Sequence, residues 1–264
     1  MRDYKPTLMS LFDGIGTAGL AMSRFYGNDF NYIAFENDQK LIDFTNDKFK
    51  QNIIHKGSVN SFDFQFPCQK PPKVDVLICG SPCQGLSKAG KRKGLEDERS
   101  ALFYKAAEIK NRVEPVYFLF ENVICNKGDC DIISDLLGVQ PVTISSLRFT
   151  PQSRLRYYWT NIDLDTVALQ YLPERHDLYH VSRQAFGQQR YSNTIPTLTS
   201  NIATCAWHKQ TKNGDWVQME WGDFEIAQGL PVGYTDTIPN TKRRKALANA
   251  FTLPVIEWIL SHVF

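Results

Sequence analysis

A cysteine and a carboxylate follow two apolar runs in this chain, and together they could carry out covalent catalysis. Cys83 lies in the turn of residues 80–87, just after the run 74–79, and Glu121 directly follows the run 116–120. Each run is typical of a buried strand of a parallel sheet, and such strands end at the same edge of the sheet. The sequence therefore predicts a nucleophilic thiol and an acid that share one pocket.

A second group of residues suits a cofactor at the same sheet edge. Gly14 and Gly16 lie between an expected strand and an expected helix, where glycine lets a ligand approach the backbone and helix N–H groups are free. Glu36 ends the next expected strand, where a carboxylate can accept hydrogen bonds from ribose hydroxyls. The turn lacks the third glycine of a pyrophosphate cradle, which favours a ligand such as S-adenosylmethionine. Taken singly, a plain glycine turn and a solvated strand end remain alternatives.

These motifs resemble, in type and in order, those of the cytosine-5 DNA methyltransferases of bacteria and phages. The Pro-Cys nucleophile and the Glu-Asn-Val tripeptide of that family match Pro82-Cys83 and the residues from Glu121 onward. Residues 81–103 resemble the family's active-site loop, and the resemblance extends over nearly the whole chain. The other matching segments are residues 12–16, Glu36-Asn37, the Gln-x-Arg-x-Arg motif at 152–156, and Asn249-Ala250.

The resemblance implies methyl transfer to carbon-5 of cytosine in duplex DNA, through a covalent Cys83 adduct on a flipped-out base. It implies S-adenosylmethionine as cofactor, with S-adenosylhomocysteine as product. The catalytic residues that it implies are Cys83, Gln84, Glu121, Asn122, Arg154 and Arg156. The cofactor residues that it implies are Phe12, Asp13, Gly14, Gly16, Glu36, Asn37, Ser58, Pro82, Leu102, Asn249 and Ala250.

Two details of these sets can be read from the residues. Ser58 stands where the family usually has an aspartate that binds the adenine amino group, so this position can form hydrogen bonds but carries no charge. Arg154 and Arg156 lie two apart in an expected strand, so both side chains are expected on one face.

Two polar segments are candidates for DNA binding. Residues 88–94 hold four basic residues and two glycines, which suits a loop that closes over a phosphate backbone. Residues 199–216 mix hydroxyl, amide and basic side chains that can contact base edges, although a merely structural insert remains an alternative. The predicted DNA contacts are Ser87, Lys91, Arg92, Lys93, Thr204, His208, Lys209, Gln210 and Lys212.

The bulk properties narrow the class of protein. The six cysteines include no C-x-x-C pair, the chain has no apolar run of membrane-spanning length, and residues 1–5 lack the apolar segment that is expected of a secretory signal. These features predict a reducing cytoplasm with free thiols, and the family resemblance implies a nucleoid-associated protein of bacterial or phage origin. His176 and His180 have a zinc-like spacing, but no further ligands complete a site, so we expect no metal. The net charge of +2 means that DNA binding depends on local basic patches.

The elements that must position these residues alternate along the first half of the chain. Strands are expected at 7–12, 32–35, 74–79, 116–120, 139–145 and 156–160, and helices at 17–25, 38–49, 100–112 and 129–137. This alternation predicts a Rossmann-like, doubly wound α/β fold with a mostly parallel sheet. Residues 162–222 read as irregular, and 242–263 as helical, with Pro254 in the first turn of the last helix.

We therefore expect a cofactor-binding catalytic domain at 1–161 and 234–264, and a small target-recognition lobe at 162–233, as compact as that of the animal de novo branch. Two alternatives remain. One is an RNA cytosine-5 methyltransferase, although the Cys-Phe-Thr tripeptide of the branch that modifies transfer RNA is absent. The other is a non-catalytic DNA-binding relative, against which Cys83, Glu121 and Arg156 argue. A restriction endonuclease partner, the recognised bases and the oligomeric state are left open.

Overall fold

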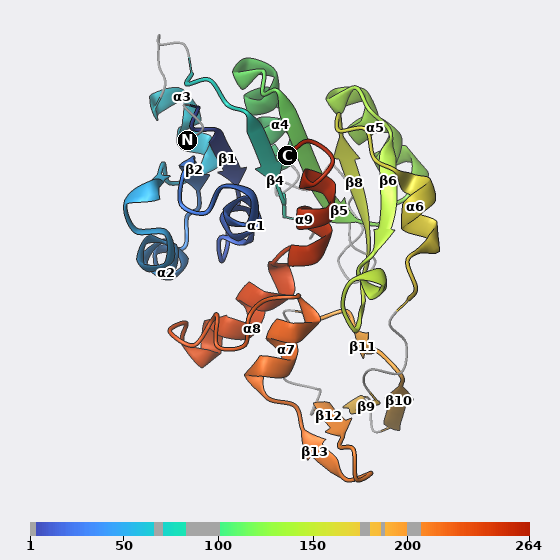
Figure 1. Cartoon of the computed structure of the whole chain (residues 1–264). Helices are drawn as coiled ribbons and strands as arrows, with labels where there is room; N and C mark the ends of the chain where they lie inside the picture. Colours follow the sequence, from blue (N-terminus) through green and yellow to red (C-terminus); the bar gives the residue numbers. More distant parts are fainter. Residues whose placement is uncertain (1–3, 66–70, 83–100, 175–179, 186–187, 200–206) are drawn as a thin grey trace. The chain divides into compact units, whose positions relative to one another are not determined.

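The chain divides into two compact units in a computed structural model that describes residues 4–65, 71–82, 101–174, 180–185, 188–199 and 207–264 (Figure 1). The first unit takes residues up to 144 together with 155–164 and 257–264. The second takes residues 145–154 and 165–256. Residues 234–256, which we expected in the catalytic domain, thus belong to the second compact unit, and the division of functions between segments stays a prediction.

The first unit is built on a sheet that, within the described residues, has seven strands in the order β3-β2-β1-β4-β5-β8-β6. The strands from β3 to β5 are parallel, and β8 runs antiparallel to β5. This arrangement confirms the predicted doubly wound, mostly parallel α/β fold. The strands are β1 (Thr7–Leu11), β2 (Asn31–Phe35), β3 (Ile53–His55), β4 (Val76–Cys79), β5 (Tyr117–Val123), β6 (Pro141–Ser145) and β8 (Leu155–Thr160).

The strand order reverses between β1 and β4, because β2 and β3 extend the sheet on one side and β5 extends it on the other. In open α/β sheets, ligands bind beyond the carboxyl ends of the strands at such a switch point. The turns that follow β1 and β4 are therefore the expected place for a cofactor. A hydrogen bond of 3.4 Å from the Gly80 N–H to the Leu11 carbonyl joins these two turns.

One face of the sheet is covered by helices that bury a continuous apolar core. Met9, Leu77 and Phe120 point into this core from three neighbouring strands, and Ala106 and Ile133 meet them from α4 and α5. The helices of this unit are α1 (Thr17–Tyr26), α2 (Gln39–Phe49), α3 (Phe62–Gln65), α4 (Ala101–Val113) and α5 (Lys127–Leu137), with short 3-10 helices at Lys50–Asn52 and Val59–Ser61.

Local signals in the sequence set the ends of these helices. The Asp38 side chain caps α2 by accepting from the Lys40 N–H, and the Asn126 side chain caps α5 by accepting from the Asp129 N–H. Helix α5 ends at Gly138, whose φ of 76° lies in the left-handed region that glycine tolerates.

The second unit has a sheet of its own, in which β10, β9, β12 and β13 pair antiparallel in that order. The expectation of irregular structure over residues 162–222 is therefore wrong. These strands are short and largely polar, so they carry no apolar run that would reveal them. The elements are β7 (Gln152–Ser153), β9 (Val181–Ala185), β10 (Gln188–Ser192), β11 (Ile195–Pro196), β12 (Trp207–Gln210), β13 (Trp216–Gln218), α6 (Thr166–Tyr171), α7 (Trp221–Ala227) and α8 (Asn240–Asn249), with a 3-10 helix at Ser146–Arg148.

The C-terminal helix α9 (Leu253–Leu260) spans the boundary between the units and has Pro254 in its first turn, as predicted. Among the described residues, no helix combines the length and the apolar character needed to cross a bilayer.

Candidate active site

The turn after β1 exposes backbone at one glycine and packs tightly at another. Phe12, Gly14 and Gly16 all have positive φ values, of 59°, 60° and 73°. A Cβ added at Gly14 would meet nothing closer than the Phe12 carbonyl oxygen at 4.0 Å, whereas one at Gly16 would lie 2.6 Å from the Phe49 ring. Gly14 therefore leaves the backbone open to a ligand, and Gly16 allows α1 to pack closely on α2.

Glu36 fastens this turn to the one that follows β2. Its Oε2 accepts from the Gly14 N–H at 2.9 Å, and its Oε1 accepts from the N–H groups of Asn37 and Asp38 at 2.8 and 2.9 Å. Because each carboxylate oxygen offers two lone pairs, Oε2 keeps the capacity for one further donor. The arrangement fits a hydroxyl group of a ribose, next to the exposed Asn37.

Asp13 lies in the protein interior. It is only 4% exposed, its Oδ1 accepts from the Tyr32 hydroxyl, and its N–H donates to the Phe35 carbonyl at 3.0 Å. Its Oδ2 is buried and has no hydrogen-bond partner among the described residues. Burial raises the pKa of this carboxyl group to about 6. Asp13 thus supports the turn after β1 from the interior.

The other predicted cofactor residues lie in three places. Phe12 and Leu102 are half-buried, and both pack against the core of the first unit. The Ser58 hydroxyl caps the 3-10 helix at Val59–Ser61 and accepts a backbone N–H at 3.3 Å. Asn249 and Ala250 end α8 in the second unit. Their roles in cofactor binding stay predictions.

The ends of β4 and β5 are joined by a buried asparagine. Asn122 Nδ2 donates to Ser81 Oγ at 3.0 Å, and the Asn122 side chain is 3% exposed. This bond holds the Ser81-Pro82 turn beside the end of β5. The chain then continues to Cys83. Seven predicted site residues lie outside the described residues: Cys83, Gln84, Ser87, Lys91, Arg92, Lys93 and Thr204.

Glu121 and Arg156 form an ion pair that is largely shielded from water. Glu121 Oε1 lies 3.1 Å from Arg156 Nε, and the two side chains are 11% and 12% exposed. The antiparallel register places Val123 opposite Arg156, which brings the two charged side chains together across β5 and β8. Charge-assisted bonds of this kind fix the orientation of a carboxylate.

The thiol of Cys79 differs from the predicted nucleophile. Cys79 ends β4 and is fully buried, and burial raises the pKa of its thiol far above the ordinary value. A thiol in this environment stays protonated and unreactive. Cys83 follows the end of β4 in the sequence, whereas Cys79 lies within the strand, and the predicted role as nucleophile depends on this difference.

Arg154 does not share a strand face with Arg156, so this part of the prediction is wrong. Arg154 lies between β7 and β8 and is 4% exposed. Its guanidinium donates to the carbonyls of Ala248 and Ala250 at 3.0 and 3.2 Å. A cation at these carbonyls satisfies the end of α8 and favours the negative end of the helix dipole. We interpret Arg154 as a residue that stabilises the second unit.

The predicted DNA contacts on β12 point in two directions. Lys209 Nζ bonds to Asp223 Oδ1 at 2.6 Å, and the Trp207 ring packs on Phe224 of α7. Because strand side chains alternate, His208 and Gln210 lie on the opposite face. Lys209 therefore fastens the sheet to α7, and its predicted contact with DNA stays a prediction. Lys212 is exposed in the following turn.

The face that carries His208 also carries an aromatic pair that the sequence did not reveal. The register aligns Tyr191, Ser182, His208 and Gln218 across the four strands. The rings of Tyr191 and Trp216 lie 5.7 Å apart, and these side chains are 70% and 41% exposed. The pair can be recognised only from the strand register, and the register of short polar strands cannot be predicted from the sequence.

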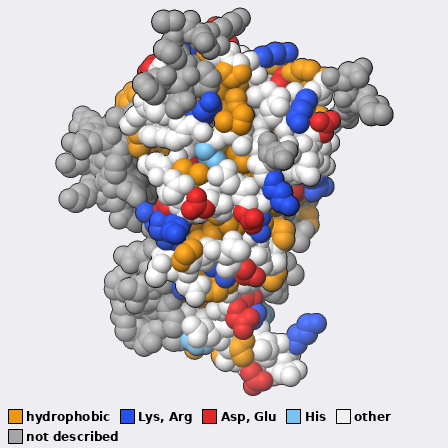
Figure 2. Space-filling view, turned by 90° about the vertical axis from the view of Figure 1, so that its left-hand side faces the viewer, with side chains coloured by type: hydrophobic (Ala, Val, Ile, Leu, Met, Phe, Trp, Pro, Cys, Tyr) orange, Lys and Arg blue, Asp and Glu red, His pale blue; other side chains and the backbone are white. Residues whose placement is uncertain are grey.

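The surface charges and the possible metal ligands do not identify a further site among the described residues. Basic and acidic side chains are interspersed on the face shown in Figure 2, in keeping with the small net charge. In the described part of the chain, no group of three or more His, Cys, Asp or Glu residues could hold a metal ion. The Nδ1 atom of His180 lies 3.1 Å from Asn193 Oδ1, and His176 lies outside the described residues.

Comparison with known proteins agrees with this geometry. Residues 7–126 match the family model of the C-5 cytosine-specific DNA methylase. The chain is 36% identical over 121 residues to the orphan methyltransferase M.SPRI of Bacillus phage SPR, a match that covers 45% of this chain and 26% of the relative. It is 30% identical over 225 residues to the type II methyltransferase M.HpaII of Haemophilus parainfluenzae, covering 78% of this chain and 60% of the relative.

A solved structure of Spodoptera frugiperda DNMT2 shares the fold, with a TM-score of 0.65 over 98% of this chain and 99% of that one, at 15% sequence identity. The chain spans from about a quarter to 60% of the length of the two curated relatives. The family model matches residues 7–126, and this segment contains the strands that form the switch point of the sheet and the bond between the ends of β4 and β5. Residues 7–126 are therefore similar to the C-5 cytosine-specific DNA methylase family, and the similarity to the type II methyltransferase M.HpaII extends over a longer part of the chain.

Proposed function

We propose that this protein transfers a methyl group from S-adenosylmethionine to carbon-5 of cytosine in duplex DNA. The observation that carries the proposal is the junction of β4 and β5. There, Asn122 holds the Ser81-Pro82 turn beside the Glu121–Arg156 pair, and Cys83 follows Pro82 in the chain. The family supplies the reaction, and this junction supplies residues of the required types.

The turns after β1 and β2 fit the cofactor. S-adenosylmethionine supplies an electrophilic methyl group when it is bound. Gly14 offers open backbone, and Glu36 Oε2 has capacity for one hydroxyl donor. Ser58 would meet the adenine without the charge that an aspartate would bring. We therefore expect cofactor binding to depend mainly on Glu36 and on the shape of the glycine turn.

In the proposed reaction, three residues of the chain have chemical roles, namely Cys83, Glu121 and Arg156. The Cys83 thiolate would add to carbon-6 of cytosine, which moves the electrons of the 5,6 double bond to carbon-5, where the methyl group is taken up. Glu121, in its protonated form, would donate a hydrogen bond to ring nitrogen-3 as negative charge develops there, and Arg156 would hold the Glu121 side chain in place. After release of S-adenosylhomocysteine, loss of the carbon-5 proton to solvent would return its bonding electrons to the ring, so that the 5,6 double bond forms again and the Cys83 thiolate leaves.

The exposed face of the small sheet is our candidate for base recognition. His208, Gln218 and the Tyr191–Trp216 pair share this face, and imidazole and amide groups can read base edges while aromatic rings stack on bases. Gln210 lies on the same face, where its amide Nε2 donates to the Gly214 carbonyl at 2.8 Å, which leaves its oxygen available as an acceptor. Lys212, in the adjoining turn, would contact phosphate.

The test measures methyl transfer from labelled S-adenosylmethionine to duplex DNA and, in a parallel arm, to transfer RNA. We expect incorporation into DNA, and DNA that carries 5-fluorocytosine should trap a protein adduct, because the last step needs a removable proton. Incorporation into RNA alone would favour an RNA methyltransferase. Binding of DNA with no transfer to either substrate would favour a non-catalytic relative.

A further inference from the structure

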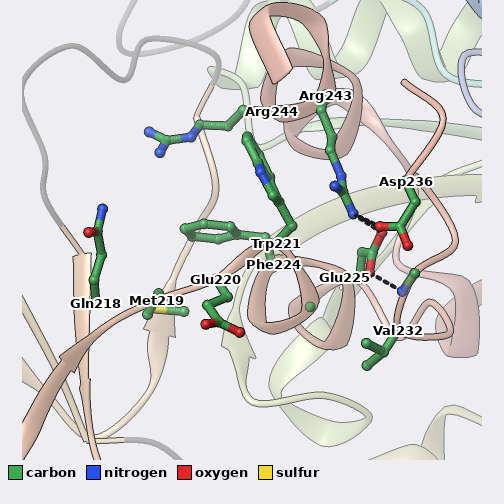
Figure 3. A pocket seen from close by; sticks show the side chains of 12 residues that line it. Gln218, Met219, Glu220, Trp221, Phe224, Glu225, Val232, Asp236, Arg243 and Arg244 are labelled. Atoms are coloured by element: carbon green, nitrogen blue, oxygen red, sulfur yellow. Dashed lines mark hydrogen bonds and ion pairs between the residues drawn. The ribbon is translucent and has the colours of Figure 1, made fainter. Parts of the chain in front are cut away.

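The charged pocket of the second unit is filled with ion pairs that the chain makes with itself. Figure 3 shows Arg243 directed at two carboxylates, and its Nη2 bonds to Glu225 Oε1 at 2.9 Å and to Asp236 Oδ1 at 2.6 Å. Glu225 is fully buried, so these bonds fasten α8 to α7 and to the loop between the two helices. The pocket therefore stabilises the second unit, and we assign no ligand to it.

Two cysteines flank the first turn of α5 in the first unit. Asn126 is the N-cap of this helix, so Cys125 directly precedes the cap, and Cys130 is the fourth residue of the helix. Side chains at these two positions often pack against each other, in the arrangement known as a hydrophobic staple. The helix start by itself therefore brings the two thiols together.

The cap fixes the turn that separates the two cysteines. Asn126 Oδ1 accepts from the Asp129 N–H at 2.9 Å, and Asn126 Nδ2 donates to Asp129 Oδ2 at 2.6 Å. The Cys130 N–H donates to the Asn126 carbonyl at 3.0 Å. Both cysteine side chains pack against the core of the first unit, and both are half-buried. Their positions are therefore fixed, while a small reagent can still reach them.

The neighbours of the two thiols give them different reactivity. The Cys125 thiol donates a hydrogen bond to the Cys130 sulfur, and burial, followed by the charges of Cys130 and Asp129, raises the pKa of Cys125 to about 12. Tyr157 of β8 lies near both cysteines, since burial and then these two groups raise the pKa of its hydroxyl. Because the thiolate is the nucleophile, Cys125 stays unreactive at neutral pH, and Cys130 is the thiol that reacts first.

From this arrangement we propose that Cys125 and Cys130 form a reversible disulfide by exchange with a low-molecular-weight disulfide such as oxidised glutathione. The Cys130 thiolate attacks one sulfur of the reagent, and the first glutathione leaves as a thiolate that takes up a proton from solvent. The Cys125 sulfur then attacks the Cys130 sulfur of the mixed disulfide, and the Cys125 proton passes to the second glutathione as it leaves. Two protein thiols are thus oxidised to one disulfide, and the reagent is reduced to two thiols.

The disulfide would lie close in the sequence to the proposed acid. Cys125 follows the end of β5 by two residues, and β5 carries Glu121 and Asn122. A bond from Cys125 to the first turn of α5 would restrict the chain directly after this strand. Disulfides of cytosolic proteins are usually transient, and catalytic or redox-sensing. The inference does not depend on methyl transfer.

The test incubates the full chain with oxidised glutathione, blocks the remaining thiols, and maps the modified cysteines by mass spectrometry. Trypsin cleaves after Lys127, between the two cysteines, so the disulfide joins peptides 113–127 and 128–148, neither of which contains another cysteine. We expect this linked pair of peptides to form, and dithiothreitol should separate it.

Two variants distinguish the roles of the two thiols. Cys125→Ser should stop at a mixed disulfide of Cys130 with glutathione, because the second thiol is absent. Cys130→Ser should attach glutathione to Cys125 about tenfold more slowly or less, because burial keeps that thiol protonated. The matched control is Asp135→Asn, at an exposed position of the same helix, which should leave the rate of disulfide formation unchanged. Melting temperatures would verify that each variant is folded.

Three outcomes would overturn the proposal. The first is a wild-type protein that carries only mixed disulfides with glutathione at Cys125 and Cys130, because the thiols would then be too far apart to join. The second is a folded protein in which both cysteines stay unmodified. The third is a disulfide that joins either of them to a different cysteine of the chain.

Discussion

Asp13 should make the stability of the folded protein depend on pH in an unusual direction. Its carboxyl group is buried, and burial raises its pKa from the ordinary 3.8 to about 6. The folded protein therefore binds this proton more tightly than the unfolded chain does. The free-energy penalty of the buried charge is fully present above about pH 6 and disappears below about pH 4. A shift of about two pH units corresponds to about 3 kcal/mol.

The substitution Asp13→Asn isolates this effect. Asparagine keeps an oxygen that can accept from the Tyr32 hydroxyl, and it does not titrate. We expect the wild-type protein to gain about 3 kcal/mol of unfolding free energy relative to the variant as the pH falls from 7.5 to 4. The measurement is urea denaturation followed by circular dichroism at several pH values. The other carboxyl groups are common to both proteins and cancel in the difference.

Asp47→Asn, at an exposed position of α2, is the control, and its difference from the wild type should stay nearly constant with pH. Two outcomes would refute the reasoning about Asp13. A pH-independent difference would mean that its carboxyl group is not held in an environment that opposes ionisation. A wild-type advantage that grows with rising pH would mean that the folded state stabilises the carboxylate.

The remaining predictions concern the chemistry and DNA binding. Cys83→Ala should form no adduct with DNA that contains 5-fluorocytosine, and an adduct that persists on denaturing gels would disprove the assignment of the nucleophile. Glu36→Ala should weaken S-adenosylmethionine binding by roughly 1.5–3 kcal/mol in calorimetry, the scale of a charged hydrogen bond, and unchanged affinity would refute its placement. Neutralising residues 91–93 should flatten the salt dependence of DNA binding, whereas His208→Ala should change the methylated sequence context, as read by methylation sequencing. Lys209→Ala should lower the melting temperature without changing that context, since Lys209 bonds to Asp223.

The central sheet could be predicted because its strands are nearly continuous apolar runs. Residues 76–79 and 118–120 are buried on both faces of the sheet, and this burial requires the Val, Ile, Leu and Phe content that the sequence shows. The candidate site residues could be predicted because an apolar run marks a strand, and a polar residue after the run marks the place where a site can lie. Glu36 and Glu121 stand where an apolar run stops, and Glu36 directly follows β2 in the structure, whereas Glu121 lies within β5, which continues to Val123.

The small sheet could not be predicted, because its strands are short and mostly polar. Strand β13 is three residues long, and all of its residues are exposed. The direction in which the side chains of the second unit point could not be predicted from the sequence either. Lys209 and His208 are adjacent in the sequence, and only the packing of Trp207 on α7 decides which of the two faces outward. Arg154 was misplaced for a related reason, because a break between β7 and β8 interrupts the alternation that the prediction had assumed.

The residues of the family-like motifs divide into those that face outward and those that hold the fold. Gly14 and Glu36 present groups to the open end of the sheet, whereas Gly16 lies against Phe49, and Arg154 holds the end of α8. Loss of activity after a change at Gly16 or Arg154 would therefore say little about chemistry, because the expected first effect is loss of stability. Only a variant that remains folded and loses one measured step, such as adduct formation or cofactor binding, can assign a chemical role.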